Sequence, residues 1–414
     1  MFFLFDDLKL LILLLYLYIT IKNKIMFQGQ YVFSQIVSLI PRYEFDKCVN
    51  KYNGNYRVKD FKCYSQYLCM LFGQLTYRES ITDLINCLKA HKNKVYHLGI
   101  NQVIAVSTLT RANEKRDWRI YQDFAHYLIK LVTPLYIENN DFTLDLKNSV
   151  YALDSSTIDL CLSTFFWPKY KKNKGAIKLH TLLNLRGNIP SFIQITDGKT
   201  HDINILDDII IEFGAIYIMD KAYIDFERLY KINNASAFFV VRAKTNMAYK
   251  RLYSNKVNKS EGVLSDQTIK LTCNKTKNKY PENLRKIKYY DKEKKKTYSF
   301  LTNNFSLSTL LIADLYKYRW QIELFFKWIK QHLKITSFWG QSENAVKTQI
   351  WISISAYLLI AYAKKILHLD KSLYEILQIL SVSTFDKTPI NELFTDSELH
   401  KYTNIKCNQL TLFD

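Results

Sequence analysis

The stretch from Leu315 to Ile335, LYKYRWQIELFFKWIKQHLKI, decides how the rest of the chain is interpreted. Its apolar residues recur at helical spacing and no Gly or Pro interrupts it, which predicts one continuous helix. At about 100° of rotation per residue, four polar side chains project within an arc of roughly 60°: Tyr316, Arg319, Glu323 and Lys330. An adjoining apolar stripe would pack on a core: Leu315, Ile322, Phe326, Ile329 and Leu333.

This helix therefore places a carboxylate beside a phenol, a guanidinium and an ammonium. A carboxylate among phosphate-binding groups suits a metal ion that acts on a phosphodiester. The alternative is an ordinary surface ion pair, because Arg319 and Glu323 stand at i,i+4 spacing and many helices carry such a pair. The rest of the chain has to decide between these two interpretations.

Composition favours a polyanionic partner. The 414 residues carry 58 Lys and Arg against 38 Asp and Glu, a formal net charge of +20. A surplus of this size favours nucleic acid, although an AT-rich genome would also enrich Lys. The seven cysteines are scattered without zinc-type spacing, which predicts reduced thiols and no structural zinc: Cys48, Cys63, Cys69, Cys87, Cys161, Cys273 and Cys407.

An apolar run from Leu8 to Ile21 stands near the N-terminus. It is short for a membrane span, and it lacks the basic start and the small-residue cleavage site of a signal peptide. We expect translation to begin at Met26 and residues 1–25 to be a non-native leader. A membrane anchor is the alternative interpretation of this run.

Residues 26–145 predict a helical module. The segment from Ser107, a predicted cap, to the residue before Pro134 is expected to form one helix with a basic first half. This pattern is typical of a helical DNA-binding domain, and a plain helical bundle with solvated charges is the alternative.

Beyond residue 146 the pattern changes to short β-type runs. One apolar strand is expected to end at Asp154, a hairpin to turn at Arg186–Asn188, and another strand to end at Asp220. Residues 245–297 predict a small antiparallel β insertion with a basic turn at Lys292–Lys296. The apolar segment 349–367 is expected to be a buried core helix and not a membrane span.

Three carboxylates in this order form a candidate metal site. Side chains at the carboxyl ends of neighbouring strands converge on one crevice of an α/β sheet, so Asp154 and Asp220 are expected to meet there. With Glu323 they would supply the oxygen ligands that Mg²⁺ prefers, enough for two ions. Each Asp alone could instead cap a turn, and four others compete by position: Asp159, Asp197, Asp202 and Asp225.

These residues resemble a bacterial insertion-sequence transposase of the DDE type, in the insertion sequence 4 family. The family signature Y-x-x-R-x-x-x-E-x-x-x-x-x-x-K is matched by Tyr316, Arg319, Glu323 and Lys330. The text LDSST around Asp154, MDKAYIDFERL around Asp220, and FLTNNF and WGQSENAVKTQIW on either side of the signature are also similar to the family.

The resemblance implies an α/β fold, a ribonuclease-H-like catalytic core interrupted by a mainly β insertion and preceded by a helical DNA-binding domain. The implied division is a helical domain at 26–145, a core at 146–244 and 298–370, the insertion at 245–297 and a tail at 371–414. It further implies Asp154, Asp220 and Glu323 as catalytic and metal-binding residues. Phosphate contacts are implied for Tyr316, Arg319 and Lys330, and DNA contacts for Arg242 and Lys244. His201–Asp202 is a candidate support of the site, and a structural histidine is the favoured alternative.

The implied activity is metal-dependent DNA cleavage and strand transfer, with two Mg²⁺ ions and Mn²⁺ as a substitute. The implied partners are the element's terminal inverted repeats, target DNA and a second copy of the chain, in the bacterial cytoplasm and without a membrane partner. The alternative is a catalytically inactive or domesticated DNA-binding relative. Some relatives in the family flip a base out of the duplex and stack it on an aromatic residue of the β insertion. All six tryptophans of this chain lie outside the insertion. A flipped base would therefore have to stack on one of its tyrosines: Tyr249, Tyr253, Tyr289 or Tyr290.

Overall fold

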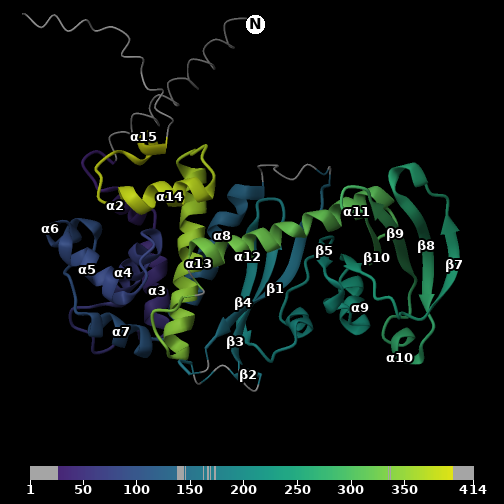
Figure 1. Ribbon diagram of the computed structural model, residues 1–414, viewed down its shortest axis with the longest axis horizontal. Helices are drawn as coiled ribbons and strands as arrows, with labels where there is room; N and C mark the ends of the chain where they lie inside the picture. The colour runs from purple at the N-terminus through teal and green to yellow at the C-terminus, as the bar shows by residue number, and fades with distance from the viewer. Residues whose placement is uncertain are drawn as a thin grey trace, which may run out of the picture.

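The computed structural model describes residues 27–394 except 138–143, 145, 162, 166, 168, 172, 173, 334 and 336. The predicted leader and the tail beyond residue 394 lie outside this range. A helical part stands at one end of the molecule and a large mixed sheet extends away from it (Figure 1). The α/β class and the N-terminal helical region are thereby confirmed.

The helical part combines both ends of the described chain. Its N-terminal helices are α2 (Val32–Ser38), α3 (Arg42–Lys51), α4 (Cys63–Leu75), α5 (Ile81–Ala90), α6 (Lys92–Val95), α7 (Val106–Lys115) and α8 (Arg119–Ile137). The C-terminal helices α13 (Glu343–Ile366), α14 (Leu373–Ser383) and α15 (Ile390–Phe394) complete it. Helix α13 packs on α4, α7 and α8. The predicted domain boundaries stay a prediction, since this helix of the predicted core packs mainly on N-terminal helices.

The expectation of one helix from Ser107 to Pro134 was wrong. The chain breaks after α7 because Asn344 donates hydrogen bonds to the backbone oxygens of Asn113 (2.8 Å) and Arg116 (2.6 Å). Asp117 then accepts a bond from the backbone N–H of Arg119, where α8 begins. Helix α8 also continues past Pro134, which lies in its last turn.

A single sheet holds all the described strands: β1 (Val150–Leu160), β2 (Lys169–Lys171), β3 (Lys174–Asn184), β4 (Ile189–Asp197), β5 (Ile216–Met219), β6 (Phe238–Arg242), β7 (Tyr249–Asn255), β8 (Val263–Leu271), β9 (Leu284–Asp291) and β10 (Lys296–Thr302). The order is β4-β3-β1-β5-β6-β10-β9-β8-β7, and β2 also pairs with β3. Strands β1, β5 and β6 are parallel, and the remaining pairs are antiparallel.

The predicted hairpin is confirmed as β3 and β4, and antiparallel strands in the predicted range 245–297 are confirmed as β7, β8 and β9. Strand β10 lies mostly beyond that range and ends at Thr302. The insertion is continuous with the central sheet, because β10 pairs with β6. Strand β1 was expected to end at Asp154, but it continues to Leu160 because β3 stays paired with it as far as Gly175.

Alternation along the strands divides the core between two faces. Val150 and Ala152 belong to one apolar cluster with α8, α12 (Trp320–His332) and α13. Tyr151 and Leu153 belong to the other, which α9 (Phe226–Asn234) covers. The first face is the one that receives the signature segment.

Helix α13 alone, among the described residues, is long and apolar enough to cross a membrane, and nearly all of its apolar window is buried inside the protein. Its largest side chain, Trp351, has no exposed surface. Burial of this kind is that of a core helix, as the sequence predicts.

A buried ion pair fixes β8 to β9 and to the chain that leads into the signature segment. Arg285 binds Asp266 through two hydrogen bonds of 2.9 Å, and both side chains are less than 8% exposed. The same guanidinium donates to the backbone oxygens of Leu307 (2.6 Å) and Asn304 (3.2 Å). One side chain therefore joins the β7–β10 strands to the start of α11 (Thr309–Tyr318).

We predict that Arg285→Ala lowers the free energy of unfolding by about 3–5 kcal/mol, because it leaves the Asp266 carboxylate buried and unpaired. Urea denaturation followed by circular dichroism measures the change. The double variant Asp266→Asn/Arg285→Met should lose less stability than Arg285→Ala, since no uncompensated charge remains. Equal losses in both variants would contradict this account.

Candidate functional site

Strand register brings the two predicted aspartates together. In the parallel strands Leu153 pairs with Met219, and Met219 pairs with Val241. The next residues along these strands are Asp154, Asp220 and Arg242, so they stand in one row across the sheet. By alternation this row faces the same side as Ala152 and Ile218, whose cluster includes α12.

The signature segment forms two helices, α11 and α12, and not the one continuous helix that was expected. Helix α11 begins at Ser308, whose hydroxyl accepts a bond from the backbone N–H of Leu311. Arg319 lies between the two helices in right-handed helical conformation. The predicted apolar stripe is confirmed, because all five of its residues are buried.

The signature side chains contact the aspartates directly. The Arg319 guanidinium donates to Asp154 Oδ2 at 2.8 Å and through its other nitrogen to Glu323. Tyr316 Oη lies 3.3 Å from Asp220 Oδ1. The structure therefore brings five of the predicted residues together, and the interpretation of Arg319–Glu323 as an isolated surface pair does not describe it.

Burial and charge shape the ionisation of Asp154. Burial raises the pKa of its carboxyl above the usual range, the Arg319 guanidinium opposes this rise, and the charges of Glu323 and Asp220 add to it. Burial likewise raises the pKa of the Tyr316 phenol to about 12. The three carboxylates thus share one electrostatic neighbourhood in which their repulsion is balanced mainly by Arg319.

The donor chemistry of this site fits a hard divalent cation, since Asp154, Asp220 and Glu323 offer only oxygen ligands. In the described part of the chain, no group of three or more His, Cys, Asp or Glu side chains is arranged closely enough to hold a metal ion. Arg319 occupies the space between two of the carboxylates and supplies the positive charge there. The assignment of the three as metal ligands stays a prediction.

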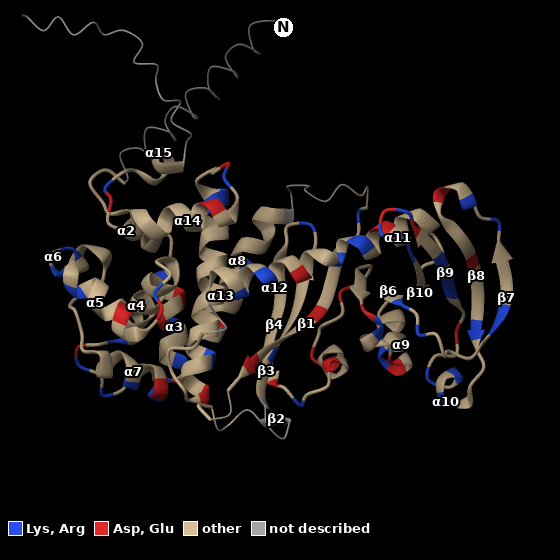
Figure 2. Ribbon diagram, viewed as in Figure 1, with Lys and Arg blue, Asp and Glu red and all other residues tan. Residues whose placement is uncertain are grey.

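A hollow of about 230 Å³ adjoins the carboxylates and is rich in cations and aromatic rings. Besides Asp220, Glu323 and a third acid, Asp291, its lining includes Arg242, Lys294, Lys296, Lys317, Arg319, Tyr289, Tyr298, Tyr316 and Trp320. Figure 2 shows basic residues on β9, β10 and α11 around this region. The sequence predicts the basic turn but not the placement of Lys294 and Lys296 at the site. Only the pairing of β10 with β6 puts them there.

Two predicted DNA contacts lie elsewhere. The Lys330 ammonium donates to the backbone oxygen of Thr157 at 2.7 Å, and burial lowers its pKa, so it anchors α12 on β1. Lys244 donates to the backbone oxygen of Ile224 and lines a separate hollow beside Met247. Arg242 is the member of that predicted pair that reaches the carboxylate site.

Three of the four competing acids have local structural partners. Asp225 caps α9 and Asp197 accepts two bonds from Thr200, while Asp159 is exposed. Asp202 pairs with Lys178 at 3.0 Å.

Sequence analysis named His201 beside Asp202, but the histidine that the structure buries near Asp202 is His180. Its Nδ1 is 4.0 Å from Asp202 Oδ1, and its Nε2 is 2.8 Å from the hydroxyl of Thr196. His180 stands next to Thr181, which pairs with Asp154 across β1 and β3. Adjacent residues of a strand face opposite sides of the sheet, so His180 faces away from Asp154 and is not part of the carboxylate cluster.

Two family models match parts of the chain. A family model described as the transposase DDE domain matches residues 145–359, more than half of the chain. A second model, described as a domain of unknown function, matches residues 28–101.

Curated relatives carry transposase names. The chain is 38% identical over 206 residues to a Sinorhizobium fredii protein described as a transposase, covering 48% of this chain and 57% of that relative. It is 25% identical over 253 residues to a Geobacillus stearothermophilus protein described as a transposase for an insertion sequence element, covering 60% and 65%. A Synechocystis protein described in the same way is 26% identical over 271 residues, covering 63% and 72%. The first two matches span less than two thirds of those relatives.

We predict that Asp154→Asn stabilises the fold at neutral pH and that the gain grows as pH rises from about 4. The folded-state pKa of Asp154 is raised, so the protonated form favours folding, and this contribution is lost as pH rises through that pKa. Urea midpoints measured between pH 4 and pH 8 test the expectation.

Asp117 provides a control of opposite sign. The Arg119 guanidinium lowers the pKa of Asp117, so its contribution is present above the unfolded-state pKa and is lost as pH falls. Asp117→Asn should therefore destabilise the fold at neutral pH. A loss of stability in Asp154→Asn at pH 7 would show that the bond to Arg319 outweighs the cost of burial.

Proposed function

The chain belongs to the family of the transposase DDE domain, and from this premise we propose that it cleaves DNA at the ends of an insertion sequence and joins the freed 3′ hydroxyls to target DNA. One observation carries the proposal. The signature residues Tyr316 and Arg319 reach Asp220 and Asp154 across the sheet and hold Glu323 in the same place. A metal-dependent polynucleotide-cleaving enzyme uses acidic groups gathered in this way beside phosphate-binding groups.

The strand order supports a ribonuclease-H-like core. Three antiparallel strands, β4, β3 and β1, continue into the parallel strands β5 and β6. The first two acidic residues stand side by side on β1 and directly after β5. The third is delivered by α12, after the β7–β10 strands have been inserted. We infer that these strands extend the core, since β10 prolongs its sheet.

Asp154, Asp220 and Glu323 would hold two Mg²⁺ ions, or Mn²⁺ in their place. Such ions lower the pKa of a bound water or hydroxyl and stabilise the leaving oxygen. Side chains of the protein bind the phosphodiester. Arg242, Lys294 and Lys296 hold the phosphodiester in the hollow, and Arg319 exchanges one carboxylate for a phosphate oxygen when DNA binds. Lys330 fixes the position of α12 on β1 through its bond to Thr157.

The partners that this function requires are duplex DNA and a second copy of the chain. Each element end needs one catalytic site, so a dimer would join both ends in a synaptic complex in the bacterial cytoplasm. Of the four tyrosines considered for stacking a flipped base, Tyr289 lines the hollow beside the carboxylates. The net charge of +20 supports a nucleic-acid partner.

We predict that Asp220→Asn and Glu323→Gln each abolish metal-dependent cleavage of a duplex carrying the element end, while DNA affinity changes less than threefold. Each variant removes a ligand charge and preserves side-chain shape. Cleavage is measured on a labelled duplex with Mg²⁺ and with Mn²⁺, and binding by gel shift.

Asp370→Asn is the matched control, since Asp370 is exposed between α13 and α14 and does not line the hollow beside the carboxylates. It should cleave at the wild-type rate. Normal cleavage by either site variant would refute the assignment of the carboxylates. Binding without cleavage by the wild-type protein would instead favour the inactive DNA-binding relative.

We predict that Lys294→Ala/Lys296→Ala weakens binding of the element end and reduces the slope of log K against log salt by about 1.8, near 0.9 for each lost phosphate contact. Titrations at several salt concentrations measure the slope. Lys250→Ala, an exposed change on the edge strand β7, is the comparison for charge alone. An unchanged slope in the double variant would remove these lysines from the DNA-binding surface.

A further inference from the structure

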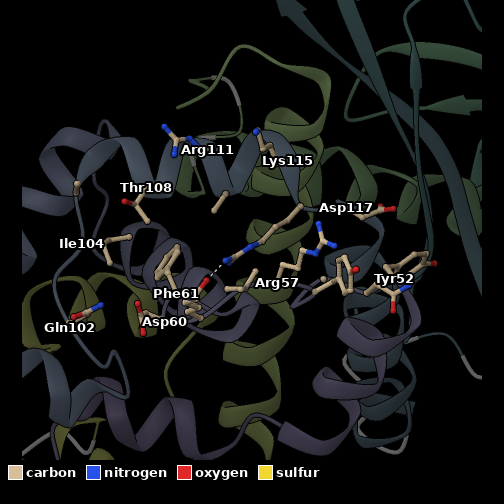
Figure 3. A pocket seen from close by; sticks show the side chains of 18 of the residues that line it. Tyr52, Arg57, Asp60, Phe61, Gln102, Ile104, Thr108, Arg111, Lys115 and Asp117 are labelled. Atoms are coloured by element: carbon tan, nitrogen blue, oxygen red, sulfur yellow. Dashed lines mark hydrogen bonds between the residues drawn. The ribbon is translucent and has the colours of Figure 1, made fainter.

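A wide hollow lies in the helical part, away from the carboxylate site. It has a volume of about 1060 Å³ and is formed by three segments: residues 52–61 between α3 and α4, residues 102–105, and residues 108–117 of α7 and its end. Figure 3 shows Arg111 and Lys115 side by side on α7, with Arg57 and Asp60 on the facing segment. The match to the transposase DDE domain does not cover this region.

The lining of this hollow carries an excess of positive charge that the protein does not neutralise. Its cations are Arg57, Lys59, Arg111, Lys115 and Arg116, against the carboxylates of Asp60 and Asp117. Asp117 is engaged by Arg119 at 2.6 Å. Among the described residues, Lys59, Arg111 and Lys115 make no ion pair with an acid. Arg111 and Lys115 also repel one another at i,i+4 spacing.

Arg116 has a different role, because it builds the wall of the hollow. Its guanidinium donates to Gln66 Oε1 at 2.9 Å and to the backbone oxygen of Phe61. Asn344 holds the backbone oxygen of the same residue at 2.6 Å. These bonds fix the 52–61 segment against the end of α7. The backbone that carries the unpaired cations is therefore held in place on both sides of the hollow.

The shape of the surface suits a long ligand. A second hollow of about 550 Å³ shares Lys59, Asp60 and Gln102 with the first and adds two cations, Lys62 and Arg42, of which Arg42 pairs with an acid on its own helix. The first hollow alone exceeds the ~300–1,000 Å³ typical of small-molecule pockets, which are also mostly apolar. Cations line both hollows, and Lys59 is shared between them, so the positive charge extends from one hollow to the other. This arrangement fits a charged polymer better than a single anion.

We propose that this groove, defined by Arg57, Lys59, Lys62, Arg111 and Lys115, binds the sugar-phosphate backbone of duplex DNA independently of sequence, at a distance from the catalytic site. Base edges are read by elements that protrude into the major groove. A concave surface edged with flexible cations instead receives the convex phosphate ridge of a duplex. The inference rests on the proposed function, in that the DNA is the duplex held by the same protein.

The test uses the full chain and two sets of duplexes that contain the element end. The short set covers the cleaved end only, and the long set adds flanking DNA in two unrelated sequences. Wild-type protein should bind the long duplexes more tightly, equally for both flanking sequences. Arg111→Ala/Lys115→Ala should lose this gain, reduce the salt slope on long DNA by about 1.8, and bind the short duplex as wild type does.

Two further variants make the result specific. Lys89→Ala/Lys92→Ala removes the same charge from exposed helical positions outside both hollows and should keep the gain. Arg111→Lys/Lys115→Arg retains the charges and should also keep most of it. Circular dichroism and the thermal midpoint check folding, since substitution of exposed side chains usually changes stability by less than about 0.5 kcal/mol.

The proposal is overturned if the Arg111/Lys115 alanine variant still binds the long duplexes more tightly than the short one, or if this difference in affinity depends on the flanking sequence. It is also overturned if added single-stranded RNA raises the affinity and added duplex DNA does not. Failure of the proposed function gives a different pattern, because wild-type protein would then bind the long duplexes but never cleave the element end in Mg²⁺ or Mn²⁺.

Discussion

The site depends on two hydrogen bonds that the Arg319 guanidinium donates, one to Asp154 and one to Glu323. Three carboxylates in a half-buried space repel one another, and burial makes each negative charge costly. Because Arg319 offers its nitrogens in a rigid planar fork, it can hold two carboxylates at once, which the point charge of a lysine does less well. Its place between α11 and α12 therefore fixes the helix, the strand and the electrostatic balance together.

This balance has a consequence for ligand binding. A guanidinium that neutralises two carboxylates competes with a divalent cation for the same oxygens, and it is also a strong ligand for phosphate. Binding of metal and DNA together would thus be favoured over binding of either alone, since the phosphate compensates Arg319 when its carboxylates turn to the metal. The catalytic arrangement would form only when the substrate is present.

Local patterns in the sequence predicted the parts of the site but not all of its geometry. The buried stripe of α12 and the aspartates of β1 and β5 follow from periodicity and chain order. The extension of β1 beyond Asp154 depends on pairing with β3, and the approach of Lys296 depends on pairing of β10 with β6. Both are contacts between distant segments, which periodicity does not encode.

The break between α7 and α8 is another feature that depends on a distant contact and that local periodicity does not predict. Residues 107–133 have helical periodicity throughout, but Asn344, more than 200 residues later, takes the two carbonyl oxygens that end α7. Asn344 lies in the first turn of α13, the helix that follows the signature segment. The groove of the helical part and the catalytic helix are therefore joined through one rigid element. Helix α13 supplies the core of the helical part, so removing either end of the described chain would expose apolar surface. The helical part and the sheet are therefore one folding unit in physical terms.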